Sequence, residues 1–208
     1  MDFFDVVTTQ RATRRLKPDP IPDAALRKIM DAAVCAPSGG NRQGWSFLVV
    51  RDAAKRARLG ELYREAWGDL MKVPFYRDAA AAPPDSAAGK MLSSARHLAE
   101  HLGEAPVLVL ACIAIDAGTK PTLTTGASIY PAVQNIMLAA RALGIGSCIT
   151  TIHKFRDAQV KELFAIPAEV ETAALIPLGS PLRKFGRPPR RPLGEVAFAD
   201  RWGRAFPA

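Results

Sequence analysis

Two arginines near the N-terminus have a spacing that suits phosphate binding. Arg11 and Arg14 stand three residues apart in the run Gln-Arg-Ala-Thr-Arg-Arg-Leu. If this run forms a turn or the end of a helix, both guanidinium groups lie on one side and can reach the same phosphate. Each guanidinium can then make two parallel, charge-assisted hydrogen bonds to phosphate oxygens. Arginines on an N-terminal helix are also common as solvated surface charge.

A polar, glycine-containing loop is the second candidate. Residues 36–45 read Ala-Pro-Ser-Gly-Gly-Asn-Arg-Gln-Gly-Trp. The adjacent glycines allow the backbone to approach a flat ligand, because glycine carries no Cβ. The neutral donors and acceptors of Ser38, Asn41 and Gln43 suit the polar edge of a heteroaromatic ring. The same residue types also form ordinary turns.

Other residues that often carry chemistry form no constellation in this sequence. It contains no Walker A or G-x-S-x-G motif, and Gly144 and Gly146 form an incomplete G-x-G after a helical pattern. His97 and His101 share a helix face without the H-E-x-x-H pattern, so we expect no metal site. We expect His153 on the surface or hydrogen-bonded in the core, and the cysteines as small core residues. We assign no catalytic acid or base.

The composition is that of a folded protein with excess positive charge. Of 208 residues, 49% are apolar and 23% charged, which is enough to fill a core. Three separated cysteines exclude a disulfide scaffold. The longest apolar run, residues 105–115, is too short to span a membrane, and the acidic start does not resemble a signal peptide. We therefore expect a reduced, cytoplasmic setting. The net charge of +8 favours anionic partners, either nucleotide cofactors or nucleic acid.

Hydrophobic periodicity predicts the elements that must position these segments. After an N-terminal helix, apolar residues at helical spacing predict helices at 23–34, 59–67, 91–102, 129–143 and 160–164. Short apolar or β-branched runs predict strands at 45–50, 107–115, 147–151 and 172–178. The second strand is apolar throughout, which is typical of burial on both faces. The mixture of helices and strands indicates an α/β or α+β protein.

Two segments contribute little to this core. Residues 69–88 are rich in Ala, Pro and Asp. We interpret them as a lid-like excursion within one domain, because the flanking segments look like parts of one core. Residues 180–208 are rich in Pro and Arg and have few apolar positions. An arm of this kind needs a surface to lie on, and a partner subunit could provide it.

Several motifs, taken together, resemble the FMN-dependent nitroreductase family. They are R-A-T-R-R-L-K-P-D-P from residue 11, A-P-S-G-G-N-R-Q-G-W from residue 36, Y-P-A-V-Q-N-I-M-L-A-A-R-A-L-G-I-G-S over 130–147, I-P-L-G-S-P from 176 and R-R-P-L-G-E-V from 190. They occur in the family's order and span nearly the whole chain.

The resemblance implies one nitroreductase-like FMN-binding domain over residues 1–208. Its fold would be α+β, with a mostly antiparallel sheet flanked by helices. Two copies would form an intertwined homodimer, with FMN at the interface and residues 180–208 lying on the partner. Residues 69–88 fall where the family varies most, so we expect them to influence the choice of substrate.

The resemblance also assigns site residues. The phosphate and ribityl end of FMN would be held by Arg11, Ala12 and Arg14, with Arg190 reaching the phosphate from the C-terminal segment. The isoalloxazine ring or the substrate side would be lined by Pro37, Ser38, Gly39, Asn41 and Gln43. Another segment that touches the flavin would comprise Thr150, Thr151 and Ile152. Gln10 and Ala12 depart from the arginine and serine that are frequent in the family, which removes two possible phosphate contacts.

The expected activity is that of an FMN-dependent oxidoreductase. NAD(P)H would be the co-substrate, and hydride would pass through FMN to a small electron-poor acceptor such as a nitroaromatic or quinone-like compound. One alternative is a specialised flavoprotein of the same fold, either dehalogenase-like or a flavin-binding sensor. A basic nucleic-acid-binding module is less favoured, because it would need exposed aromatic residues among its basic ones. We therefore expect neither nucleic acid nor a membrane as a partner.

Overall fold

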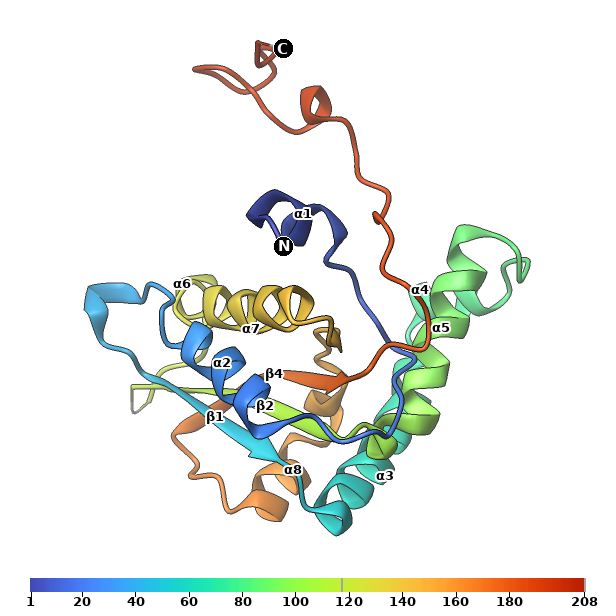
Figure 1. The fold of residues 1–208 in the computed structure, drawn as a ribbon, viewed down its shortest axis with the longest axis vertical. Coiled ribbons are helices and arrows are strands. Elements are labelled where there is room, and N and C mark those ends of the chain that lie inside the picture. The colour runs from blue at the N-terminus through green and yellow to red at the C-terminus, as the bar shows by residue number, and fades with distance from the viewer. Residues whose placement is uncertain (117, 208) are drawn as a thin grey trace.

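The computed structural model describes residues 1–116 and 118–207, and a four-stranded sheet lies at its centre (Figure 1). The strands are β1 (Trp45–Val50), β2 (Val107–Ala114), β3 (Gly146–Ser147) and β4 (Val170–Gly179). They are arranged in the order β1-β2-β4-β3, and every neighbouring pair is antiparallel. The α+β class with an antiparallel sheet flanked by helices is thereby confirmed.

Alternate side chains of β2 enter two separate hydrophobic cores, as its uninterrupted apolar run predicted. Val109 and its odd-numbered neighbours pack into one core, whereas Leu110 and its even-numbered neighbours pack into the other. The first core is covered by α2 (Asp23–Ala33) and α7 (Tyr130–Ala142). The second is covered by α3 (Ala53–Leu70), α5 (Ala87–His101) and α8 (Asp157–Phe164). The sheet is therefore enclosed between two helical layers.

Most predicted elements are present with shifted ends. β1 has the predicted bounds, and α2 ends before Pro37, a residue type that disfavours helical conformation in the residue preceding it. The N-terminal helix is α1 (Phe3–Thr9). The single-turn helix α6 (Leu123–Gly126) was not predicted, and a threonine capping box stabilises it. None of the described helices is long and apolar enough to cross a membrane.

Residues 69–88 are more regular than their composition suggested. They contain α4 (Pro74–Ala80), which lies between the end of α3 and the start of α5. Pro74 occupies the first turn, where the missing N–H costs nothing, and alanine is a strong helix former. The composition of the segment did not predict this helix, because a proline favours the start of a helix as readily as it interrupts one. A lid role stays a prediction.

The strand predicted at 147–151 is interrupted. Gly146 and Ser147 pair with β4, and Thr150 pairs again with Leu175 in the same register. In that register Cys148 lies opposite Pro177, which has no N–H to donate to the ladder. The proline therefore reduces the predicted strand to a two-residue strand and one isolated bridge.

Residues 10–17 lie beside the sheet in an extended conformation. The N–H of Thr13 donates to the carbonyl of Ser147 at 2.8 Å, and the N–H of Lys17 donates to the carbonyl of Ser180 at 2.8 Å. The turn or helix end predicted for Arg11 and Arg14 was wrong, because α1 ends at Thr9 and residues 10–17 form neither. The backbone bonds to β3 and to the end of β4 replace the helical ones.

The C-terminal arm first lies against the body of the molecule, where the ring of Phe185 is 4.1 Å from the guanidinium of Arg141, and its distal part then leaves the body (Figure 1). Its 3-10 turn is Leu193–Glu195, and it exposes large apolar side chains: Trp202 is 90% and Leu193 is 63% exposed. Exposed apolar surface of this size is typical of an interaction surface. That the arm lies on a partner subunit stays a prediction.

Candidate functional site

A basic pocket lies where the extended segment 10–17 meets the start of the C-terminal arm. The N–H of Leu182 donates to the carbonyl of Arg15 at 3.1 Å, which holds the two segments together. The pocket has a volume of about 550 Å³, and α5 forms its other wall. Its basic lining residues are Arg11, Arg14, Arg15, Lys90, Arg183 and Lys184.

The charge of this pocket is not neutralised within the described part of the chain. None of its six basic side chains forms an ion pair there, and no carboxylate is among the lining residues. By contrast, Arg27, Arg58 and Arg191 each lie against a carboxylate on their own helix or turn. Unpaired guanidinium and ammonium groups around a hollow form a site for a multiply charged anion.

The predicted polar loop has a strained backbone that local hydrogen bonds stabilise. Gly40, Asn41 and Gln43 have φ angles of 59°, 54° and 50°, and this left-handed region is uncommon for residues with a side chain. The Oγ of Ser38 accepts from the N–H of Gln43 at 3.0 Å, and the amide of Gln43 donates to the Asn41 side chain at 3.1 Å. Strain retained in this way is a frequent property of ligand sites.

This loop faces a different hollow from the basic pocket. A pocket of about 520 Å³ is lined by Ser38, Gly39 and Arg42 together with residues that follow β2. The N–H of Gly39 donates to Ser128 Oγ at 3.0 Å, and Arg42 pairs with Asp116 at 2.9 Å. The two segments that the sequence singled out therefore line separate pockets within one chain.

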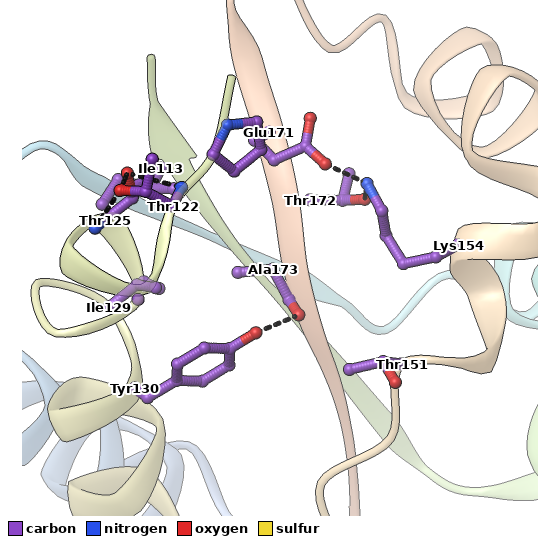
Figure 2. A pocket seen from close by; sticks show the side chains of 12 residues that line it. Ile113, Thr122, Thr125, Ile129, Tyr130, Thr151, Lys154, Glu171, Thr172 and Ala173 are labelled. Atoms are coloured by element: carbon purple, nitrogen blue, oxygen red, sulfur yellow. Dashed lines mark hydrogen bonds and ion pairs between the residues drawn. The ribbon is translucent and has the colours of Figure 1, made fainter. Parts of the chain in front are cut away.

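The third predicted segment, residues 150–152, runs from the isolated bridge at Thr150 into a 3-10 turn that begins at Ile152. Tyr63 on α3 shares a hydrogen bond of 2.7 Å with the hydroxyl of Thr150, and burial raises the pKa of this tyrosine. Ile152 packs against the core beneath α3. Thr151 lines a smaller hollow of about 230 Å³, in which Figure 2 shows Tyr130 directed at the carbonyl of Ala173.

A network of paired charges borders this smaller hollow. Lys154 contacts the carboxylate of Glu171 and that of Asp157, the latter at 3.0 Å, and Figure 2 shows the first contact. His153 is fully buried beside them, and its Nε2 lies 3.2 Å from Thr172 Oγ1, while Nδ1 has no hydrogen-bond partner among the described residues. Burial lowers the pKa of His153 to about 4, so the ring is neutral at pH 7. The expectation of a hydrogen-bonded core histidine is met at one of its two nitrogens.

The remaining candidates lie outside these pockets. Arg190 is on the exposed arm, where its guanidinium donates to the carbonyl of Pro189 at 3.0 Å. His97 and His101 stack at 4.3 Å, and their nitrogens contact Arg15 and Glu104. Within the described residues, no group of three His, Cys, Asp or Glu side chains could hold a metal ion.

The cysteines divide into two groups. Cys112 and Cys148 are buried, and burial raises their thiol pKa values to about 11 and about 12. Such thiols are unreactive at neutral pH. Cys35 is exposed, so the prediction that it is a core residue was wrong. It lies at the C-terminal end of α2, where its thiol donates to the carbonyl of Asp31 at 3.3 Å.

Sequence reasoning missed part of the basic pocket. Arg183, Lys184 and Lys90 line it but are not among the predicted site residues. The signal available was the clustering of basic residues at both ends of a chain whose middle is nearly balanced. That α5 also contributes a wall could not be inferred from this pattern.

Comparison with known proteins identifies the class. The model of the nitroreductase family matches residues 7–180. Protein DrgA of Synechocystis is 30% identical over 206 residues, covering 94% of this chain and 95% of the relative. An NADH dehydrogenase of Thermus thermophilus is 27% identical over 203 residues, covering 95% and 96% of the two chains.

A solved structure supports the same fold. Oxidised iodotyrosine deiodinase bound to FMN and 3-iodo-L-tyrosine superposes with a TM-score of 0.75 at 24% identity, covering 96% of this chain and 99% of the other. The chain belongs to the nitroreductase family. It is accordingly an NAD(P)H-dependent flavin oxidoreductase.

Proposed function

We propose that the chain acts as a homodimer that binds FMN, accepts hydride from NAD(P)H and passes it to a small electron-poor acceptor, nitroaromatic or quinone-like. The observation that carries the proposal is the unpaired basic pocket. Arg11 and Arg14, which the family motif assigns to the cofactor, both line it. Without an anion, so many like charges around one hollow would repel one another.

FMN fits the residues that are present. Its phosphate would be held by Arg11 and Arg14, and Ala12 lies between them on the pocket wall. Arginine forks suit phosphate because they offer paired donors. Arg190 would reach the same phosphate only if the exposed arm is rearranged or comes from a second subunit.

The ring side of the cofactor is expected to come from a second copy. Pro37, Ser38, Gly39, Asn41 and Gln43 belong to a loop whose pocket is separate from the basic one. A homodimer would bring this loop of one subunit to the basic pocket of the other. The apolar side chains exposed on the arm and on α1, where Phe4 is 71% exposed, would be covered in such a dimer.

The chain's own residues would bind, orient and enclose the reactants. When bound, the flavin supplies the hydride transfer. The amide and hydroxyl groups of Ser38, Asn41 and Gln43 would fix the ring by its polar edge, and Tyr63 would hold Thr150, Thr151 and Ile152 in position. We assign no side chain as acid or base, because His153 and Tyr63 are buried and kept neutral.

The first test is the visible absorption spectrum of the purified protein, recorded before and after addition of NADPH or NADH under argon. We expect the two bands of an oxidised flavin, bleached by at least one of the donors. A protein that contains no flavin and takes up no added FMN would contradict the proposal. Flavin bands that neither donor bleaches would favour a sensor role instead.

The acceptor is tested on the reduced enzyme. A nitroaromatic, a benzoquinone and a halogenated tyrosine are each added anaerobically, and reoxidation of the flavin is followed. We expect the first two to reoxidise it faster than the third. Selective turnover of the halogenated tyrosine would replace the proposed acceptor class with a dehalogenase activity. Because several solved and curated relatives are named iodotyrosine deiodinase, this third compound belongs in the panel.

A further inference from the structure

The basic pocket contains more positive charge than the phosphate of FMN can neutralise. Six Lys and Arg side chains line it, and none of them forms an ion pair within the described residues. A phosphate monoester carries about two negative charges at neutral pH. About four positive charges would therefore stay uncompensated beside the bound phosphate. This surplus points to a second anion.

Part of the surplus lies along α5. Lys90, Ser93 and Ser94 all line the pocket, and their spacing puts them on one face of the helix. The turn that precedes α5 packs closely against the first turn of this helix, since a Cβ at Gly89 would lie 2.3 Å from the carbonyl oxygen of Pro83. Ser86 caps the helix by accepting from the N–H of Gly89 at 3.0 Å. The ammonium and the two hydroxyl groups are thus presented from a fixed helix start.

Arg15 faces the same wall. Its Nη1 lies 3.4 Å from Nδ1 of His97, which is one turn further along the same face of α5. Burial and the neighbouring charge of Arg15 lower the pKa of His97, so this ring stays neutral at pH 7. His97 therefore orients the guanidinium without cancelling its charge.

We propose that Arg15, Lys90, Ser93 and Ser94 form a second anion subsite, which binds the 2′-phosphate of NADPH. The inference rests on the proposed function, because it identifies the donor of that reaction. A guanidinium, an ammonium and two hydroxyls supply the donors that a phosphate monoester accepts. NADH lacks this phosphate, so the subsite favours NADPH.

The test measures kcat/KM for NADPH and for NADH on the FMN-loaded protein. We expect the wild type to prefer NADPH. Lys90→Gln and Arg15→Gln should each lower kcat/KM for NADPH about three- to tenfold, the loss of one exposed charged hydrogen bond, while the value for NADH stays unchanged. The matched control is Lys55→Gln, an exposed lysine on α3 outside this pocket, which should change neither value.

A binding measurement gives a readout that does not depend on turnover. Adenosine 2′,5′-bisphosphate and adenosine 5′-monophosphate are titrated into the FMN-loaded protein by calorimetry. We expect the bisphosphate to bind more tightly to the wild type and this advantage to shrink in Lys90→Gln and Arg15→Gln. Equal binding of the two nucleotides to the wild type would overturn the subsite.

Other results also overturn it. Equal losses for NADH and NADPH would place the contact on a group that both donors share, and an equal loss in Lys55→Gln would indicate only the overall charge of the protein. These failures differ from failure of the proposed function. A protein that binds FMN and is bleached by both donors without preference refutes the subsite alone, whereas a protein without flavin refutes the proposed function.

Discussion

Lysines and arginines have opposite surroundings in two regions at the edge of the sheet. In the basic pocket, six of them face one hollow without forming ion pairs within the described residues. Near the start of β4, Lys154 and Lys161 are each within 4.0 Å of both Asp157 and Glu171. Two positive charges there meet two negative ones, so the charge network is balanced.

This difference in pairing indicates a ligand-binding role for the basic pocket and a structural role for the network near β4. A balanced, partly buried network stabilises the fold only if every partner is kept, and it has little charge left for a ligand. An unpaired cluster costs stability through repulsion and regains it when an anion binds. We therefore expect mutations in the first region to change ligand affinity and mutations in the second to change the free energy of unfolding.

The largest effect is expected from removing the two arginines of the N-terminal motif. Arg11→Ala combined with Arg14→Ala should weaken FMN binding by about 100-fold or more, because each charged hydrogen bond contributes about 1.5–3 kcal/mol. The dissociation constant is measured by quenching of FMN fluorescence. Arg27→Ala, an exposed residue paired with Asp31 on α2, serves as the control. Equal affinities of the double variant and the wild type would remove these residues from the site.

Disruption of the balanced network should act on stability. Among the described residues, Asp157→Ala leaves Glu171 as the one remaining carboxylate beside Lys154 and Lys161 and removes the acceptor of the Thr172 hydroxyl, so we expect the free energy of unfolding to fall by about 2 kcal/mol. Urea denaturation measures this loss, and FMN affinity should be unchanged. Glu61→Ala removes the exposed pair with Arg58 and should cost less than about 0.5 kcal/mol. A larger effect of Asp157→Ala on FMN affinity than on stability would contradict the comparison.

The buried imidazole of His153 should make stability depend on pH. Its pKa is lowered to about 4 in the folded chain, whereas an unfolded histidine titrates near 6.5. Between these values the unfolded state binds a proton that the folded state does not, so stability is lost as the pH falls below about 6.5. The expected loss from pH 7 to pH 5 is about 2 kcal/mol.

Urea denaturation at the two pH values tests this dependence. His153→Phe should reduce the difference by most of that amount, because it removes the titrating group while Thr172 keeps its bond to Asp157. The same pH dependence in wild type and variant would assign the effect to other groups.

A smaller effect is expected where β3 supports the basic segment. At Gly146 a Cβ would lie 2.7 Å from Cγ2 of Thr13 and 2.9 Å from Cδ2 of Leu16. Gly146→Ala should displace residues 12–16, cost about 1 kcal/mol and weaken FMN binding a few-fold. Gly68→Ala on α3 has no atom within 4 Å of the added methyl and should be neutral or stabilising. Unaltered FMN affinity in Gly146→Ala would show that the segment tolerates displacement.

Much of the fold could be predicted from the sequence. Local patterns in the sequence predicted the uninterrupted apolar strand β2, the periodic apolar faces of α2 and α7 and the aromatic run of β1. The failures have identifiable causes. Pro74 begins a helix in a segment for which no helix was predicted, and Pro177 interrupts a ladder thirty residues away in sequence. In both places the effect of a proline depends on its position within an element, which composition does not reveal.

The candidate site was predicted in parts. The spacing of Arg11 and Arg14 and the polar loop at 37–43 indicated a phosphate and a flat ring, and these assignments stay predictions. The turn or helix end predicted for the two arginines was wrong, although both line one pocket. Lys90 and Arg183 also line this pocket, because backbone contacts bring together segments that are distant in the chain.

The sequence by itself determined the types of most elements, the apolar faces that bury them and the motifs that relate the chain to its family. Those features are local, because periodicity, turn chemistry and motif spacing act over a few residues. Only the tertiary structure decided which charges are paired. Asp157 and Glu171 neutralise Lys154 and Lys161, while the arginines of the N-terminal segment meet other cations. Coulomb energy depends on distance in space, so identical residue types became structural in one region and available for binding in the other.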